Sequence, residues 1–323
     1  MLVTGASGFI GSHVAEYLFE QGEQVKILVR QDKRIGFQGE EKIEKKVGDL
    51  RFKDSVLNAL HGVDTVYHLA AELRMGMVTK NELHQINAQG ARTIIEACQE
   101  KKVQKLIFCS SVGVLGDTFD VVADETVSPS PDDDYERSKY EGEKAALDAA
   151  SDDLEVVIVR PAWVYGPRDR RTLKLFKLIN SGKMFMIGQG LNKLHPVFIG
   201  DLVRGIVATG RGAVPTGSIF HLAGPQIITV RELLNLAAQL LGKRIIPLHF
   251  PLSLARMIAA VLEPLFKKVG KEAPLTRGKL GFFIKNRMYS IEKAKKELAY
   301  NPEIYLEDGL RQTFNWYKKQ NIL

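Results

Sequence analysis

Residues 3–18, VTGASGFIGSHVAEYL, place three glycines at intervals of three residues and then continue into an apolar pattern of helical spacing. Gly5, Gly8 and Gly11 follow a short β-type run at residues 2–4, so the expected order is strand, glycine turn and helix. In that order, a turn without Cβ atoms lets the backbone approach a pyrophosphate, and the helix N-terminus offers it unpaired N–H groups. The pattern therefore predicts the phosphate-binding turn of a dinucleotide site. The spacing meets G-x-G-x-x-G only in part, so a plain glycine-rich turn between strand and helix stays open.

The next predicted strand, residues 25–29, bears on which dinucleotide binds, because it is followed by Arg30. An NAD site usually carries an acidic residue about 20 positions beyond the glycines, where it accepts a hydrogen bond from the ribose 2′-hydroxyl. Arg30 is basic instead, and Lys33 and Arg34 follow it closely. Because a guanidinium fork binds phosphate oxygens through two parallel hydrogen bonds, these residues favour a 2′-phosphate and hence NADP(H). The alternative is that they are solvated loop cations and that the cofactor is NAD.

The composition of the 323-residue chain, 45% hydrophobic and 26% charged, is typical of a globular protein with one large domain or two interlocked ones. Its net charge of +7 is spread along the chain without a Lys/Arg block, so we expect anionic small molecules rather than nucleic acid as ligands. Two cysteines, Cys98 and Cys109, provide neither a disulfide framework nor metal-ligand spacing. No signal peptide precedes the first strand and no apolar run is long enough to span a membrane, so we expect a cytoplasmic protein.

Short apolar runs alternate with helical stretches along the first half of the chain. The expected strands are residues 25–29, 65–69, 105–109 and 156–159, and the expected helices include residues 81–101 and 135–150. This alternation predicts an α/β fold with a doubly wound parallel sheet that helices cover on both faces. We assign residues 1–167, joined by about 195–225, to a dinucleotide-binding Rossmann domain. Residues 168–194 and 226–323 are expected to form a smaller, interwoven C-terminal substrate domain.

Tyr135 and Lys139, in the segment YERSK, lie four residues apart on a predicted helix and so share one face of it. A neighbouring ammonium and an oxidised nicotinamide both favour the phenolate, so the tyrosine can exchange a proton with a substrate alcohol. Upstream, the strand KLIFC delivers Ser110 and Ser111 at its C-terminal end, where open α/β sheets bind their ligands. A serine there can hold a carbonyl oxygen. The Y-x-x-x-K spacing alone is also common on solvated helix faces.

The order of these features makes the chain similar to a known family. It resembles the extended short-chain dehydrogenases/reductases, the NAD-dependent epimerase/dehydratase family, over nearly its full length. The branch it resembles most is that of 3β-hydroxysteroid dehydrogenases and dihydroflavonol reductases. The matching pieces are TGASGFIG, GDL at 48–50, HLAA at 68–71, Asn87, SSVGVLG, YERSK, RPAWVYGPRD and KAKKELAYNPEIYLEDGL.

The resemblance implies a role for each matching position. Ser111 rather than Ser110 would be the catalytic serine, Tyr135 the general acid/base, and Lys139 the residue that binds the nicotinamide ribose and lowers the tyrosine pKa. With Arg30, the implied cofactor-binding residues are Gly5, Gly8, Phe9, Ile10, Gly11, Asp49, Leu50, Leu69, Ala70, Ala71, Asn87, Ser110, Tyr135, Lys139, Pro161, Ala162 and Val164. Of these, Asp49 and Leu50 would flank the adenine, Ala70 and Ala71 would pass beneath the pyrophosphate and ribose, and Pro161 with its neighbours would line the nicotinamide.

Departures from the family pattern narrow the reaction. Dehydratases carry Asp-Glu directly after the catalytic serine or threonine, where this chain has Val112 and Gly113, and Leu115 replaces a tyrosine near the substrate mouth. Epimerases hold NAD through an acid at the end of the second strand, where Arg30 stands. We therefore expect an NADP(H)-dependent oxidoreductase that interconverts a secondary alcohol and a ketone on a bulky, apolar substrate. The alternatives are a nucleotide-sugar 4-epimerase with bound NAD and a non-catalytic NADP-sensing protein.

Polar clusters outside this set are interpreted as structural. Asp133 and Glu136 have the spacing of a capping box at the start of the Tyr135 helix, and no metal is expected at residues 132–134. His68, His195 and His221 lie in or beside apolar strand-like runs and are interpreted as packed histidines.

Residues 251–270, PLSLARMIAAVLEPLFKKVG, form the most apolar segment of the second half. A buried helix of the substrate domain is one interpretation. The other is a lid or interfacial helix with possible peripheral membrane contact, because charged residues interrupt the segment yet leave a broad apolar face. The resemblance further implies a homodimer formed through the helices that begin near Asn81 and Tyr135.

Overall fold

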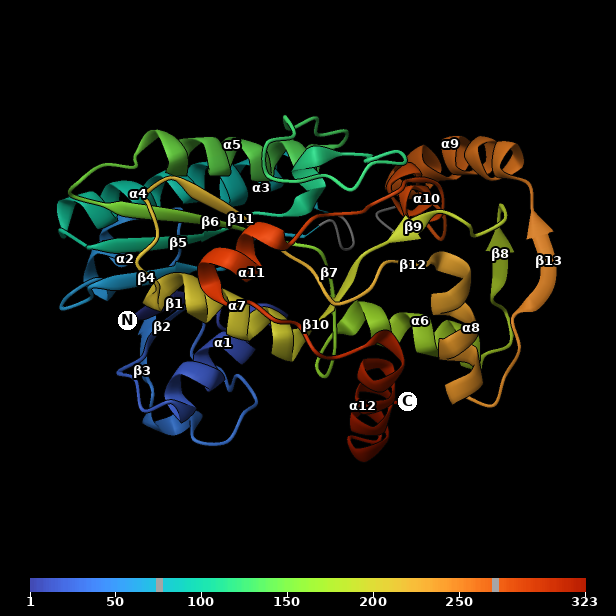
Figure 1. Cartoon of the computed structure of the whole chain (residues 1–323), viewed down its shortest axis with the longest axis horizontal. Helices are drawn as coiled ribbons and strands as arrows, with labels where there is room; N and C mark the ends of the chain where they lie inside the picture. The colour runs from blue at the N-terminus through green and yellow to red at the C-terminus, as the bar shows by residue number, and fades with distance from the viewer. Residues whose placement is uncertain (74–77, 269–272) are drawn as a thin grey trace.

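The computed structural model describes residues 1–73, 78–268 and 273–323, and its centre is a seven-stranded parallel sheet (Figure 1). The strand order is β11-β6-β5-β4-β1-β2-β3, and every neighbouring pair is parallel. The strands are β1 (Leu2–Thr4), β2 (Lys26–Val29), β3 (Glu44–Val47), β4 (Thr65–His68), β5 (Lys105–Cys109), β6 (Glu155–Pro161) and β11 (Ser218–Leu222). The chain reverses its direction across the sheet between β1 and β4, which is the switch point where open α/β sheets bind dinucleotides. The predicted doubly wound Rossmann sheet is confirmed.

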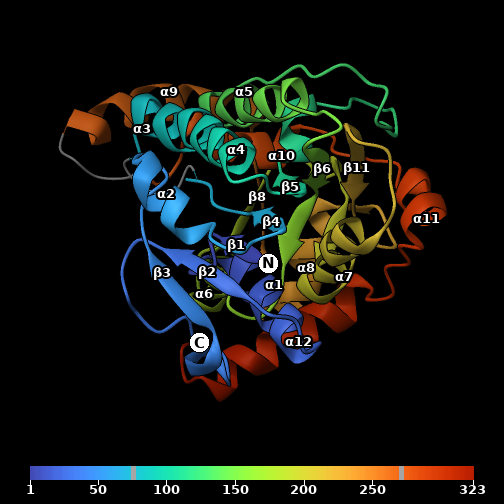
Figure 2. The ribbon, with the colours of Figure 1, turned by 90° about the vertical axis from the view of Figure 1, so that its left-hand side faces the viewer.

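Helices cover both faces of this sheet, as Figures 1 and 2 show. One face carries α2 (Lys53–Ala59), α4 (Gly90–Glu100) and α5 (Asp134–Asp148), and the other carries α1 (Phe9–Glu20) and α7 (Ile199–Arg211). Each strand divides its side chains between two separate cores: Leu106 and Phe108 pack on the α4 side, while Ile107 packs on the α1 side. This burial on both faces explains why the strand sequences are nearly continuous apolar runs.

The stretch from 81 to 101, expected as one helix, is interrupted in the structure. It consists of α3 (Lys80–Leu83), a π-helical segment η2 (His84–Gln89) and α4. Thr79 begins α3 with a capping box to Glu82. Since π-helical turns insert an extra residue and frequently occur at functional sites, the segment that contains Asn87 is of interest for the site.

The second half of the chain returns to the sheet and also builds smaller units. The remaining elements are η1 (Glu40–Lys42), η3 (Val112–Leu115), β7 (Trp163–Tyr165), α6 (Arg170–Asn180), β8 (Phe185–Ile187), β9 (Lys193–Leu194), β10 (Pro196–Phe198), β12 (Ile228–Thr229), α8 (Val230–Leu240), β13 (Ile246–Phe250), α9 (Leu252–Lys268), α10 (Arg277–Ile284), α11 (Glu292–Leu298) and α12 (Leu306–Lys319). Three two-stranded sheets join β7 with β10, β9 with β12, and β8 with β13.

We call β8, β13, α9 and α10 together the α9–α10 lobe, which lies at the opposite end of the molecule from β3 (Figure 1). Its own small core contains Ile187, Ala255, Ala259 and Leu280. Only the inner face of α9 is packed, so the interpretation of a buried helix holds for half of it. Among the described helices, none combines the length and hydropathy that a membrane span requires.

Candidate active site

The glycine turn after β1 is packed so closely that side chains are excluded. Gly5 has a φ of +71°, and a Cβ there would lie 2.6 Å from the amide nitrogen of Ala70. A Cβ on Gly11 would lie 2.2 Å from the carbonyl oxygen of Gly5, which also accepts a hydrogen bond from Gly8 N at 2.8 Å. The turn therefore holds β1, α1 and the chain after β4 in backbone contact at the switch point. Phe9 and Ile10 follow on the first turn of α1 and stay partly exposed there.

The chain after β4 forms the opposite wall of the same crevice. Ala70 N donates to Thr4 Oγ1 at 3.2 Å, and that hydroxyl also meets His68 Nδ1 at 2.9 Å. His68 is fully buried, and burial, assisted by the charge of Lys139, lowers its pKa to about 3. The imidazole is therefore neutral at ordinary pH. Leu69, Ala70 and Ala71 are partly exposed directly after it, at the position where the resemblance places them beneath the pyrophosphate.

Asn87 links this wall to the helix that carries the candidate catalytic residues. Its Oδ1 accepts from Glu72 N at 2.7 Å, and its Nδ2 donates to Glu72 O and to Ser138 Oγ, each at 3.0 Å. The side chain is almost completely buried. The π-helical turn thus turns Asn87 toward the crevice wall, where its contacts hold the chain around Glu72 against α5.

At the predicted adenine end, Asp49 lies beside two arginines. Arg51 donates to its carboxylate through Nε at 3.0 Å and Nη2 at 2.6 Å, and these bonds, with a smaller contribution from the nearby charge of Arg30, lower the pKa of Asp49. Arg30 is exposed at the end of β2 and makes no hydrogen bond or ion pair with the described residues. Arg34 instead pairs with Glu40 at 3.6 Å. Arg30 is therefore available for a phosphate, whereas Arg34 is paired, and sequence reasoning did not single out Arg51.

The two serines after β5 differ in their contacts. Ser111 caps η3, where its Oγ accepts from Gly113 N at 3.0 Å, and it is partly exposed. Ser110 is buried, and its Oγ has no hydrogen-bond partner among the described residues. A buried hydroxyl without a partner is costly unless a ligand group satisfies it, so Ser110 fits the predicted contact with a bound cofactor.

Tyr135 and Lys139 occupy the first two turns of α5. Lys139 is fully buried, its Nζ donates to Cys109 O at 2.5 Å and lies 5.2 Å from the ring centroid of Phe108. Burial lowers the pKa of this ammonium, and the smaller effects of Cys109 and Glu143 oppose that shift. Since Cys109 directly precedes the two serines, this bond brings the Tyr–Lys face of α5 against the C-terminal end of β5. The structure thus packs α5, which carries Tyr135 and Lys139, against the C-terminal end of the strand that precedes Ser111.

The end of β6 and the strand β7 that follows it carry further predicted cofactor-binding residues. Pro161, Ala162 and Val164 are buried, and Ala162 N donates to Leu222 O at 3.0 Å. Between them Trp163 is partly exposed, stacks on Tyr165 with ring centroids 5.6 Å apart, and lies 6.3 Å from the ring of Phe282 in α10. Sequence analysis did not single out Trp163 or Phe282. Their contact joins the predicted nicotinamide end to the α9–α10 lobe.

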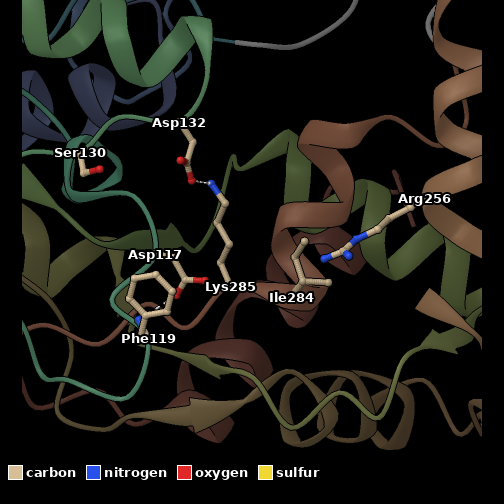
Figure 3. Close-up of a pocket in the computed structure, with 7 residues that line it drawn as sticks. All are labelled: Asp117, Phe119, Ser130, Asp132, Arg256, Ile284 and Lys285. Carbon is tan, nitrogen blue, oxygen red and sulfur yellow. Dashed lines mark hydrogen bonds and ion pairs between the residues drawn. The ribbon is translucent and has the colours of Figure 1, made fainter. Parts of the chain in front are cut away.

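A pocket of about 300 Å³ lies between the α9–α10 lobe and the loop that connects Ser111 to Tyr135 (Figure 3). Its lining residues are Asp117, Phe119, Ser130, Asp132, Arg256, Ile284 and Lys285. Lys285 reaches across to pair with Asp132, while Arg256 points in from α9. The loop side of the pocket thus carries two acidic residues and the opposite side carries two basic ones. Each side also contributes one apolar side chain, Phe119 and Ile284.

The predicted capping box at α5 forms only in half. Asp133 accepts from Glu136 N at 2.9 Å, as the spacing predicts. Glu136 does not return a bond to Asp133; its carboxylate accepts from Asp132 N at 2.9 Å and from Arg287 Nη2 at 3.0 Å. The prediction was wrong on this second bond because a cation from a distant segment competes for the glutamate.

His195 and His221 are packed, as interpreted from the sequence. His195 Nε2 meets Gly224 O at 2.8 Å, and burial lowers its pKa. His221 lies 3.5 Å from Arg160 Nη1, and burial together with that cation lowers its pKa to about 3. Both imidazoles are thus neutral side chains of the folded structure.

Comparison with known proteins extends these observations. Residues 1–223 match the model of a family described as the NAD dependent epimerase/dehydratase family. The chain is 30% identical to the mouse sterol-4-alpha-carboxylate 3-dehydrogenase, decarboxylating, over 96% of its own length and 89% of that protein. It is 28% identical to 2-alkyl-3-oxoalkanoate reductase of Stenotrophomonas maltophilia, over 97% of both. The crystal structure of gox2253 superposes with a TM-score of 0.83 at 31% identity and covers 100% of this chain and 98% of that one.

Proposed function

The chain belongs to the NAD dependent epimerase/dehydratase family, and on that premise we propose that it is an NADP(H)-dependent oxidoreductase that interconverts a secondary alcohol and a ketone on a bulky, apolar substrate. The resemblance to extended short-chain dehydrogenases/reductases is thereby confirmed. One observation supports the proposal: Lys139, one helical turn after Tyr135, donates to Cys109 O at the end of the strand that precedes Ser111.

The residues of the crevice fit a nicotinamide dinucleotide. The turn at Gly5 and Gly11 has no room for a Cβ and leaves backbone N–H groups at the start of α1 for phosphate oxygens, and the buried Ser110 hydroxyl needs a partner. When bound, the nicotinamide supplies or accepts the hydride at the substrate carbon.

The side chains of this protein handle the proton. In the direction of reduction, the Tyr135 hydroxyl donates its proton to the carbonyl oxygen, while the Ser111 hydroxyl donates a hydrogen bond to that same oxygen. In the direction of oxidation, the tyrosine takes the proton from the alcohol. Lys139 has three donors and uses one on Cys109 O, so two remain for the ribose hydroxyls and for stabilising the phenolate.

The preference for NADP(H) rests on Arg30. Its guanidinium is exposed at the end of β2 and has no partner among the described residues, so it is available for a 2′-phosphate. Arg30 also lies near Asp49. The ribose 2′-hydroxyl of NAD would therefore face a cation at this position, where an NAD site usually has an acidic residue.

The apolar substrate class is supported by two kinds of observation. The relatives named above act, by their names, on a sterol and on an alkyl-substituted oxoalkanoate. In this chain, Trp163, which stacks on Tyr165, and Phe282 present rings where the α9–α10 lobe meets the predicted nicotinamide end. Ring surfaces of this kind bind apolar skeletons by burial of area, at about 25 cal/mol per Å².

The test is a panel of substrates with NADPH and with NADH. Ketones on fused-ring, isoprenoid or flavonoid-like skeletons should be reduced with NADPH, and sugar nucleotides should not react. Epimerisation of UDP- or dTDP-sugars with tightly held NAD would replace the proposal with the epimerase alternative. Cofactor binding without turnover of either class would favour the sensor.

Two further proposals concern partners. The outer face of α9 exposes Leu254, Met257, Val261 and Leu265 on one stripe, with fractional exposures from 37% to 60%. Together with the net charge of +7, this stripe supports peripheral contact with an anionic lipid surface, which is where an apolar substrate would be dissolved. A homodimer through α4 and α5 is proposed from the family resemblance, and sedimentation of the purified protein tests it.

A further inference from the structure

Glu136, the residue after Tyr135, is a buried carboxylate at the centre of a network that the proposed chemistry does not use. Its side chain is 3% exposed. Oε2 accepts from Asp132 N at 2.9 Å and lies 4.0 Å from Lys285 Nζ, while Oε1 accepts from Arg287 Nη2 at 3.0 Å. A buried carboxylate is tolerated only when it is paired in this way, so the network is a requirement of this position.

The same side chain packs against the turn that holds Ser111. A Cβ added to Gly113 would lie 3.3 Å from Glu136 Cγ and 3.6 Å from its Oε1, and 3.1 Å from Ser111 Oγ. The Gly113 amide is also the donor to Ser111 Oγ. Glu136 therefore contacts the serine turn on one side and, through its own backbone, continues the helical turn of Tyr135 on the other. Glu136 thus connects the turn that carries Ser111 to the helix that carries Tyr135.

Arg287 and Lys285 bring a third part of the molecule to this junction. They belong to residues 285–290, which follow α10 and run along the loop between Ser111 and Tyr135. Thr118 N donates to Asn286 O, and Ala123 N to Met288 O, each at 2.9 Å. At the far end of the same connection, α10 places Phe282 against Trp163. Lys285, Asn286 and Arg287 lie between the end of α10 and Glu136, so a shift of α10 upon substrate binding would be transmitted to Glu136 through these three residues.

We propose that Glu136 and Arg287 are positioning residues, which hold the Ser111 turn and the Tyr135 helix in register and connect them to the α9–α10 lobe. The proposal rests on the proposed function, because it assigns the pair a part in that reaction. The glutamate that dehydratases carry after the catalytic serine or threonine would stand at position 113, where this chain has glycine. The carboxylate of Glu136 lies beside that position and pairs with Arg287.

The pair also sets the charge beside the tyrosine. The charged and titratable groups around this junction are Lys139, Asp133, Asp134, Arg137 and Glu143 of α5 and its cap, Asp117 and Asp132 of the preceding loop, Lys80 of α3, and Lys285, Arg287 and Tyr289 of the C-terminal segment. Removing one member of the Glu136–Arg287 pair leaves the charge of the other uncompensated next to Tyr135. The two single substitutions should therefore act in opposite directions on the ionisation of the phenol.

The experiment compares Glu136→Gln, Arg287→Met and the double variant in the direction of alcohol oxidation, where kcat rises with pH as the tyrosine loses its proton. Arg287→Met leaves a negative charge and should move the rising limb to higher pH by about 0.3–1 unit, and Glu136→Gln should move it to lower pH by a similar amount. The double variant should return the limb to the wild-type position but keep kcat about 10-fold low, with KM changed less than 3-fold, because the positioning contact is lost.

Asp120→Asn provides the matched control. It weakens the exposed bond from Asn286 Nδ2 to Asp120, 3.1 Å, which joins the same two segments without touching Glu136. This variant should keep the wild-type kcat and pH profile. Shifts of the same sign in both single variants, no shift in either, or an equal loss in the control would overturn the proposal.

A second measurement needs no substrate. The ionisation of Tyr135 is followed as the difference in phenolate absorbance between each variant and its Tyr135→Phe counterpart. If the titration shifts in opposite directions in Glu136→Gln and Arg287→Met but the protein reduces no ketone, the positioning pair is supported and the proposed function is rejected. Unshifted titrations in an active enzyme would reject the pair alone.

Discussion

The seven-stranded sheet and the α9–α10 lobe are stabilised in different ways. The strands of the sheet bury side chains on both faces in two large cores, and a Cβ added to Gly5 or Gly11 of its glycine turn would lie less than 3 Å from backbone atoms. Among the described residues, the small core of the lobe contains Ile187, Ala255, Ala259 and Leu280, and more than half of the surface of Met257, Val261 and Leu265 is exposed. Substitutions in the sheet are therefore expected to destabilise the protein, whereas the exposed residues of the lobe can be substituted at little cost in stability. We infer that the sheet fixes the cofactor and the reaction, and that the lobe selects the substrate.

The largest effect is expected for Tyr135→Phe, in the sheet region. Removal of the phenolic oxygen deletes the proposed proton donor, so kcat should fall about 10²–10⁴-fold. Binding of NADPH, measured by fluorescence titration, should stay within a few-fold of wild type. Tyr140→Phe, one turn further along α5, is the control and should keep its activity. A near-normal rate in Tyr135→Phe would reject the catalytic assignment.

The glycine turn should be the most sensitive point of the fold. In Gly11→Ala, the new Cβ would lie 2.2 Å from the carbonyl oxygen of Gly5, so the turn must open, at a cost of about 3 kcal/mol in the free energy of unfolding. Gly8→Ala meets the same oxygen at 3.1 Å and should cost clearly less. Thermal denaturation of both variants measures the difference. Equal stability would mean that the glycines serve the phosphate alone.

Cofactor choice should change with Arg30→Asp. The variant loses a charge-assisted contact worth about 1.5–3 kcal/mol and repels the 2′-phosphate, so the NADPH/NADH ratio of kcat/KM should fall by about 10- to 100-fold. Arg34→Asp is the control, since Arg34 already pairs with Glu40. If wild-type protein uses both cofactors equally well, the NADP(H) assignment is wrong.

The smallest effect on stability is expected in the lobe. Val261→Asp places a charge on the exposed stripe of α9, so the free energy of unfolding should change by less than about 0.5 kcal/mol. Binding to anionic phospholipid vesicles in a flotation assay should weaken several-fold, with NADPH binding unaffected. Ala259→Asp, directed into the small core, is the opposite case and should destabilise the lobe. Vesicle binding that Val261→Asp does not alter would remove the proposed lipid contact.

The first region was predictable because its signals are local. The strand, glycine turn and helix lie within residues 3–18, and Tyr135 and Lys139 are one helical turn apart, so their relation follows from helix geometry. What the local pattern did not show is that Gly5 is also required by packing, since Ala70, which it contacts, lies 65 residues further along the chain.

The second region was less predictable because its contacts join distant residues. Trp163 meets Phe282, and Glu136 meets Arg287, across more than a hundred residues in each case, and no periodicity encodes such pairs. Helix α9 was read correctly as amphipathic, but the sequence does not tell which of its faces packs. In the structure Ala255 and Ala259 face inward, so Val261 lies on the surface rather than in a pocket.

Transfer of the hydride tests the central claim most directly. NADPH that carries deuterium at C4 is incubated with a reactive apolar ketone, and the product alcohol is analysed by mass spectrometry. The account predicts that one deuterium appears on the carbinol carbon with wild-type protein, and that the labelled alcohol is lost in Tyr135→Phe although the cofactor still binds. Deuterium retained entirely in the cofactor, with a UDP- or dTDP-sugar epimerised by the same preparation, would contradict it.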